Sequence, residues 1–276
     1  MQTPAPPFRV DVTTSGLQLD QNDLARRLAS LPQGVPVVAM IHGYRFSPGI
    51  TGACPHRHIF SLTPPDDDRT AISWPRHLGL DGNSGLALAF GWPARGSLLG
   101  AHRRAARAGR ALAELAALVE QLDPGRGVDV IAHSLGARVA LSALPDAQPG
   151  QFRRLILLAA AETRRPARAA LASAAGRSAE VINVTTREND LFDFLAEWLL
   201  AFGFDTALGQ GIGAKRPNWL DLQIDQPATR AVLHRLGHPL PPPPQRISHW
   251  SPYLRPGVFG LYRALLDRSL PLHGLA

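Results

Sequence analysis

Short apolar runs recur along this chain at intervals of a few tens of residues. Each run is rich in β-branched or small apolar side chains, which is typical of strands buried on both faces of a parallel sheet. The predicted buried strands are VPVVAMIHGY (35–44), GLALAFGW (85–92), VDVIAHS (128–134), RRLILLAAA (153–161) and AEVINVTT (179–186). Apolar and polar residues alternate in FRVDVTT (8–14), which predicts an early strand, and WLDLQID (219–225) is a candidate last strand.

Segments with helical periodicity lie between these runs. They are NDLARRLASL (22–31), with Asn22 as a candidate cap, HRRAARAGRALAELAALVEQL (102–122), GARVALSAL (136–144), PARAALASAA (166–175), DLFDFLAEWLLAFG (190–203) and GVFGLYRALLDRSL (257–270). Alternation of strands and helices predicts an α/β fold with a mostly parallel central sheet and helices on both faces. We expect one domain over residues 1–276, with lid-like insertions at about 45–84 and 191–246.

Composition is that of an ordinary globular protein, with 45% hydrophobic and 18% charged residues. No apolar run reaches the ~18–20 residues of a membrane-spanning helix. The first residues lack the pattern of a secretory signal. Cys54 is the only cysteine, so we expect a reducing compartment and a cytoplasmic protein.

The formal net charge is +7, and arginines cluster at 102–110 and 162–170. No recognition motif accompanies these arginines, so nucleic acid is not an expected partner. Solvated helix faces are the favoured interpretation, and contact with anionic or lipid surfaces is the alternative. No integral membrane association is expected.

Ser134 stands where a buried strand ends and a helix begins, in the stretch VDVIAHSLGARVAL (128–141). A serine on such a tight turn projects over the carboxyl edge of the sheet, where ligands of open α/β sheets bind. The turn requires small neighbours, and Gly136 supplies one. Ala132 stands on the other side, so that the pattern is A-x-S-x-G.

The stretch AHSLGARVAL resembles the nucleophile elbow of the α/β-hydrolase superfamily, in which some bacterial lipases also carry alanine at the first position. The resemblance implies a serine, an acid and a histidine in that order along the chain. Asp190, in VINVTTREND after a late strand, matches the position of the acid. Glu188, Asp193 and Glu162 are rivals, and Asp190 could instead cap the following helix.

The resemblance also places the histidine after the last strand and before the closing helix. His249, in RISHWSPY, meets this condition. His234 lies in a helical run and His238 in a turn before a proline, so both are expected to be structural or exposed to solvent. His249 follows the candidate last strand at an unusual distance. Either RIS is the last strand or another segment intervenes.

The oxyanion of an acyl-transfer reaction needs two donors, and the resemblance implies the backbone N–H groups of Leu135 and Tyr44. His42, in the IHGY stretch, is expected to brace the loop rather than to act as a base. His42, Trp92 and His133 are candidates for lining the substrate pocket, although Trp92 could equally be a core residue.

Together these motifs imply a serine hydrolase that cleaves a carboxylic ester, with Ser134, His249 and Asp190 as its catalytic triad. The expected partner is a small-molecule ester or acyl substrate, and no cofactor is expected. Thioesterase, acyltransferase or amidase activity on the same triad is an alternative, as is a non-catalytic binding protein that retains the fold. CPHRH (54–58) contains zinc-ligand residue types but lacks a second cluster, so no metal site is expected.

Overall fold

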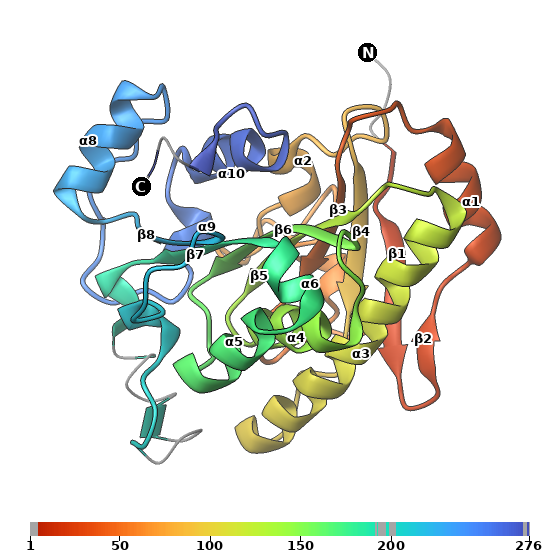
Figure 1. Ribbon diagram of the computed structural model, residues 1–276, viewed down its shortest axis with the longest axis horizontal. Coiled ribbons are helices and arrows are strands. Elements are labelled where there is room, and N and C mark those ends of the chain that lie inside the picture. The colour runs from red at the N-terminus through yellow and green to blue at the C-terminus, as the bar shows by residue number, and fades with distance from the viewer. Residues whose placement is uncertain (1–4, 191, 193–196, 199–202, 273–274, 276) are drawn as a thin grey trace.

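The structure is a computed structural model that describes residues 5–190, 192, 197–198, 203–272 and 275. At its centre lies an eight-stranded sheet in the order β2-β1-β4-β3-β5-β6-β7-β8 (Figure 1). Only the edge pair of β1 and β2 is antiparallel, and every other neighbouring pair is parallel. The strands are β1 (Phe8–Thr13), β2 (Gly16–Gln18), β3 (Val37–Ile41), β4 (Leu86–Gly91), β5 (Val128–His133), β6 (Phe152–Leu158), β7 (Glu180–Thr185) and β8 (Trp219–Gln223).

Helices cover both faces of the sheet. One buried cluster joins the sheet to α1 (Gln21–Ser30), α3 (Leu98–Leu122), α4 (Leu135–Ala143), α5 (Arg164–Leu171) and α6 (Ala174–Ser178). The other cluster joins the sheet to α2 (Trp74–Leu78), α8 (Pro227–Arg235), α9 (Ser251–Leu254) and α10 (Val258–Leu266). The predicted α/β fold is thereby confirmed.

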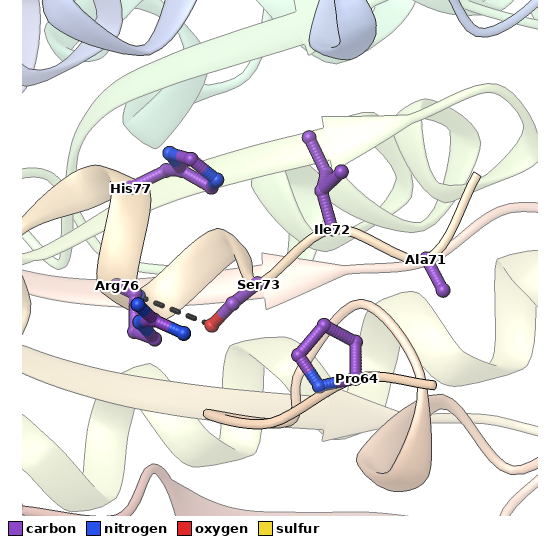
Figure 2. Close-up of a pocket in the computed structure, with 6 residues that line it drawn as sticks. All are labelled: Pro64, Ala71, Ile72, Ser73, Arg76 and His77. Atoms are coloured by element: carbon purple, nitrogen blue, oxygen red, sulfur yellow. Dashed lines mark hydrogen bonds between the residues drawn. The ribbon is translucent and has the colours of Figure 1, made fainter. Parts of the chain in front are cut away.

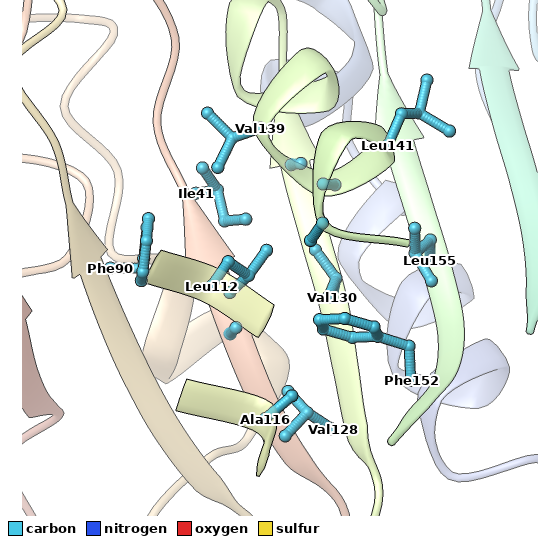
Figure 3. Close-up of a cluster of buried hydrophobic side chains, with 14 of the residues drawn as sticks. Ile41, Phe90, Leu112, Ala116, Val128, Val130, Val139, Leu141, Phe152 and Leu155 are labelled. Carbon is cyan, nitrogen blue, oxygen red and sulfur yellow. The ribbon is translucent and has the colours of Figure 1, made fainter. Parts of the chain in front are cut away.

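Strand β3 explains why the central strands are apolar at every position. Val37, Ala39 and Ile41 pack into the first cluster, whereas Val38 and Met40 pack into the second. Figure 3 shows the first cluster, in which side chains from the strands meet side chains from α3 and α4. Because both faces are covered, polar residues inside these strands would lose their hydration without compensation.

The predicted strands are found with shortened ends, and the helices differ in detail. Asp20, rather than Asn22, caps α1, because its side chain accepts from the N–H of Asp23. Helix α3 begins at Leu98 instead of residue 102, because Ser97 caps it. The predicted helix at 166–175 is two helices, separated where the side chain of Ser173 caps α6.

Helix α8 resolves the long separation between the last strand and His249, because it intervenes between β8 and the loop that carries this histidine. The helix predicted at 190–203 lies largely outside the described residues, where only residues 190, 192, 197, 198 and 203 are placed. Among the helices that the structure describes, none has the length and apolar character needed to cross a bilayer.

Candidate active site

Ser134 occupies a strained turn between β5 and α4. Its backbone has φ 55° and ψ −123°, a conformation that L-residues rarely adopt. The turn is held on both sides, since the N–H of Ser134 donates to the carbonyl of Leu158 at 2.8 Å and its carbonyl accepts from the N–H of Ala161 at 3.1 Å. The strain is therefore fixed by the neighbouring strand β6 and the loop that follows it.

The residues that flank the turn explain its A-x-S-x-G pattern. A Cβ atom on Gly136 would lie 2.7 Å from the carbonyl oxygen of His42 and 2.8 Å from that of Ile41, so this position requires glycine. Ala132, in contrast, is a fully buried member of the β5 ladder, paired with Ile41 and Leu157. An alanine is thus accommodated at the upstream position.

The structure brings Ser134 and His249 together across the carboxyl edge of the sheet. Oγ of Ser134 lies 2.7 Å from Nε2 of His249, within hydrogen-bond distance. Nδ1 of His249 lies 2.6 Å from Oδ1 of Asn189. An amide oxygen can only accept, so Nδ1 carries the proton and Nε2 is left to accept the proton of the serine hydroxyl.

The prediction of Asp190 as the orienting acid is not met by this geometry, because Asn189 occupies that position. Residues Arg187–Asn189 form a 3₁₀ turn, followed by Asp190. With about three residues per turn, consecutive side chains point in different directions. Asn189 is buried and faces the imidazole, whereas Asp190 is exposed.

Two of the other candidate acids, Glu162 and Glu188, form ion pairs with arginines. Glu162 pairs with Arg138 and accepts from the N–H of Thr163. Glu188 pairs with Arg255. Asp193 lies outside the described residues.

Aromatic groups surround the imidazole of His249. The ring of Phe192 lies 4.8 Å from it and that of His133 lies 4.7 Å from it, centroid to centroid. Nε2–H of His133 donates to the backbone carbonyl of His249 at 3.0 Å, so His133 supports the loop of the candidate base. Burial lowers the pKa of His249 well below its usual value, and the neighbouring His133 lowers it further.

The two predicted oxyanion donors lie at the same edge. Leu135 is the first residue of α4, directly after Ser134. Gly43 brings the loop after β3 against the elbow, since a Cβ atom there would lie 2.9 Å from Cβ of Ser134. Tyr44 follows Gly43, and its hydroxyl donates to the carbonyl of Gly96. Within the described part of the chain, neither the N–H of Leu135 nor that of Tyr44 donates to an acceptor.

His42 and Trp92, the predicted candidates for lining a substrate pocket, both have completely buried side chains in this structure. Their rings stack at 5.6 Å, and Nε2 of His42 accepts from the N–H of Trp92 at 3.1 Å. Nδ1 of His42 donates to the carbonyl of Gly43 at 2.9 Å, so this histidine braces the loop. Burial lowers the pKa of His42 to about 3 and keeps it neutral. His133, the third candidate, is buried beside the site.

Two cavities of the structure are lined by neither Ser134 nor His249. One of about 310 Å³ is lined by Pro64, Ala71, Ile72, Ser73, Arg76 and His77, in the stretch between β3 and β4 (Figure 2). It includes none of the candidate residues. A second, of about 350 Å³, lies at the carboxyl ends of β7 and β8, where Asp190 and Glu197 contribute to a polar lining with Thr185, Thr186 and Arg187.

The histidines of the CPHRH stretch are paired with carboxylates. His56 lies 2.6 Å from Asp11, and His58 lies 2.9 Å from Asp68. Cys54 is buried and free. Across the residues that the structure places, no three histidine, cysteine, aspartate or glutamate side chains converge as a metal site would require.

Comparison with known proteins agrees with this fold. The family described as "Alpha/beta hydrolase of unknown function (DUF900)" matches residues 19–159, from the residue before Asp20 to the loop after β6. The matched region therefore includes Ser134 and both predicted oxyanion donors, and it supports hydrolase activity. None of the curated proteins is detectably similar to this chain. Because the match spans just over half of the sequence, the protein belongs to this family of α/β hydrolases.

Proposed function

We propose that this protein is a serine hydrolase that cleaves a carboxylic ester through an acyl-enzyme intermediate. The observation that carries the proposal is the 2.7 Å contact between Oγ of Ser134 and Nε2 of His249, at a strained elbow on the carboxyl edge of the sheet. A serine hydroxyl becomes a useful nucleophile only when a base of this kind accepts its proton. The family match supports the coarser function, hydrolysis.

In the proposed reaction, Oγ of Ser134 attacks the ester carbonyl carbon while Nε2 of His249 accepts the hydroxyl proton. The N–H groups of Leu135 and Tyr44 donate to the oxyanion that forms. The imidazolium then gives its proton to the departing alkoxide, and the C–O bond breaks to leave an acyl-serine. A water molecule repeats the sequence with the same histidine as base, which releases the acid and frees Ser134.

Asn189 favours an ester over an amide as the substrate. Its Oδ1 holds the productive tautomer of His249 but contributes no full negative charge to stabilise the imidazolium. An amide nitrogen leaves only after it is protonated, so amide cleavage depends more strongly on proton transfer from the imidazolium than departure of an alcohol does. A neutral orienting residue is therefore better matched to the easier leaving group.

Exposed apolar side chains gather near the same edge and support an apolar acyl group. Ile247 and Trp250 flank His249 and are 55% and 42% exposed, respectively. Phe192 packs on the imidazole itself. A hydrocarbon chain bound over these side chains would gain about 0.8 kcal/mol per buried CH₂ group, or roughly fourfold in kcat/KM.

Steady-state hydrolysis of p-nitrophenyl esters of increasing chain length tests the proposal, with acyl-CoA thioesters and anilides beside them. We expect turnover of esters that rises with chain length, with anilides turned over much more slowly, and no turnover by Ser134→Ala. Turnover of thioesters alone would indicate the thioesterase alternative. An absence of turnover on every substrate would contradict the proposal.

A further inference from the structure

Glu188 lies next to the candidate base assembly but does not contact the imidazole. It is 3% exposed, and Oε2 of its carboxylate accepts from the hydroxyl of Ser251 at 2.5 Å and from the hydroxyl of Thr186 at 3.1 Å. The same oxygen accepts from the guanidinium of Arg255. Three donors therefore converge on one buried carboxylate oxygen.

The backbone of Glu188 makes a second link to the same loop. Its carbonyl accepts from the N–H of Ser248 at 2.8 Å. The hydroxyl of Ser248 in turn accepts from the N–H of Ser251 at 3.1 Å. Glu188 thus contacts residues on both sides of His249 while it directly precedes Asn189 in the chain.

Arg255 connects this cluster to the sheet. Its other terminal nitrogen donates to the carbonyl of Ile224, immediately after β8, at 3.0 Å. Its side chain is fully buried, so the ion pair with Glu188 is shielded from water. Arg255 also neutralises the carboxylate of Glu188, the residue that directly precedes Asn189.

We propose that Glu188 is a positioning residue for the base. Its contacts with Ser248, Ser251 and Arg255 hold the loop of His249 against the turn of Asn189, and thereby set the contact between Nδ1 and Oδ1. The inference rests on the proposed function of Ser134 and His249. A displacement of about 1 Å in such an assembly costs up to about a hundredfold in rate.

A double-mutant cycle with Asn189→Ala separates positioning from general stability. We expect Glu188→Gln to lower kcat on a p-nitrophenyl ester about tenfold, with KM within about twofold of the wild-type value. In the Asn189→Ala background the same substitution should change kcat less than about twofold, because residues that act as a unit are non-additive. Equal effects in both backgrounds, or an unchanged kcat in the folded single variant, would overturn the inference.

Asp129→Asn is the matched control. Asp129 is fully buried and pairs with Arg268 at 2.7 Å, near the amino end of β5 and so at the opposite edge of the sheet from Ser134. This variant should lose stability but retain kcat. Ser251→Ala replaces Glu188→Gln if that variant does not fold, because it removes one contact of Glu188 and leaves the ion pair with Arg255. We expect a smaller fall in kcat with the same non-additivity. An unchanged kcat would contradict the inference.

Fluorophosphonate labelling keeps this inference distinct from the proposed function. Failure of the wild-type protein to label at Ser134 would defeat the proposed function itself. Labelling of the wild type and of Glu188→Gln at equal rates would defeat only the role of Glu188.

Discussion

Oδ1 of Asn189 lies 2.6 Å from Nδ1 of His249, so the histidine that contacts Ser134 is oriented by a neutral amide. An amide oxygen selects the tautomer as well as a carboxylate does, but it adds no negative charge beside the ring. Burial also lowers the pKa of His249. The candidate base is therefore neutral, and able to accept a proton, in mildly acidic solution.

Activity should accordingly persist below pH 6.5. A base acts only in its deprotonated form, and His249 is deprotonated down to pH values well below the usual histidine pKa. The pH profile of kcat/KM on a p-nitrophenyl ester measures this directly. An acid limb at or above pH 6.5 would conflict with the environment described for His249.

Asn189→Asp should move the acid limb to higher pH. A carboxylate beside the imidazole favours the imidazolium and raises its pKa by about 1–3 units. Asn189→Ala should lower kcat about 10- to 100-fold, because the tautomer is no longer held.

Asp190→Asn is the control for both variants. Asp190 is exposed and does not contact the imidazole, so this substitution should change kcat less than about twofold. A large loss of kcat in Asp190→Asn alone would restore Asp190 as the orienting residue.

Acid should destabilise the fold between pH 6.5 and pH 5. Burial lowers the pKa of His42 to about 3 and that of His133 to about 4. The unfolded chain, with ordinary histidine pKa values, binds more protons in this range, so the free energy of unfolding falls as the pH falls. Each such histidine contributes about 1.4 kcal/mol per pH unit. Urea unfolding at pH 7, 6 and 5 checks this, and a free energy that stays constant or increases toward pH 5 would refute it.

Substitutions at the two small residues around Ser134 should both lower stability but differ in their effect on activity. Gly136→Ala places a methyl group against the carbonyl oxygens of Ile41 and His42, so we expect a loss of about 1–3 kcal/mol of stability and a large fall in activity. Ala132→Gly removes a buried methyl group from β5 and should cost ~1 kcal/mol with little change in kcat. Thermal melts and initial rates of both variants make the comparison. Tolerance of Gly136→Ala would show that the elbow has more space than the structure describes.

Much of the fold could be predicted because its central strands are buried on both faces. Apolar runs such as Val37–Ile41 are typical of strands that are buried on both faces. Their alternation with helices predicts a mostly parallel sheet. Short elements without a strong pattern, such as β2 and α2, could not be predicted. These short elements depend on contacts with residues that are distant in the sequence, which a local pattern does not reveal.

Within the candidate site, Ser134 and His249 could be placed by order along the chain, but the orienting residue could not. Glu188, Asn189 and Asp190 are consecutive, polar and equally well placed after β7. The 3₁₀ turn sends the first toward Arg255, the second toward His249 and the third to solvent. Sequence order does not reveal that rotation. The resemblance implies an acid at this position, so it does not point to an amide such as Asn189.

Mass spectrometry of the protein after reaction with a fluorophosphonate most directly tests whether Ser134 is an activated nucleophile. We predict a single covalent adduct located on Ser134 in the native protein. No adduct should form in Ser134→Ala or in protein that is unfolded in urea before the reagent is added. Native protein that remains unmodified, or an adduct on another residue that persists in Ser134→Ala, would contradict the account.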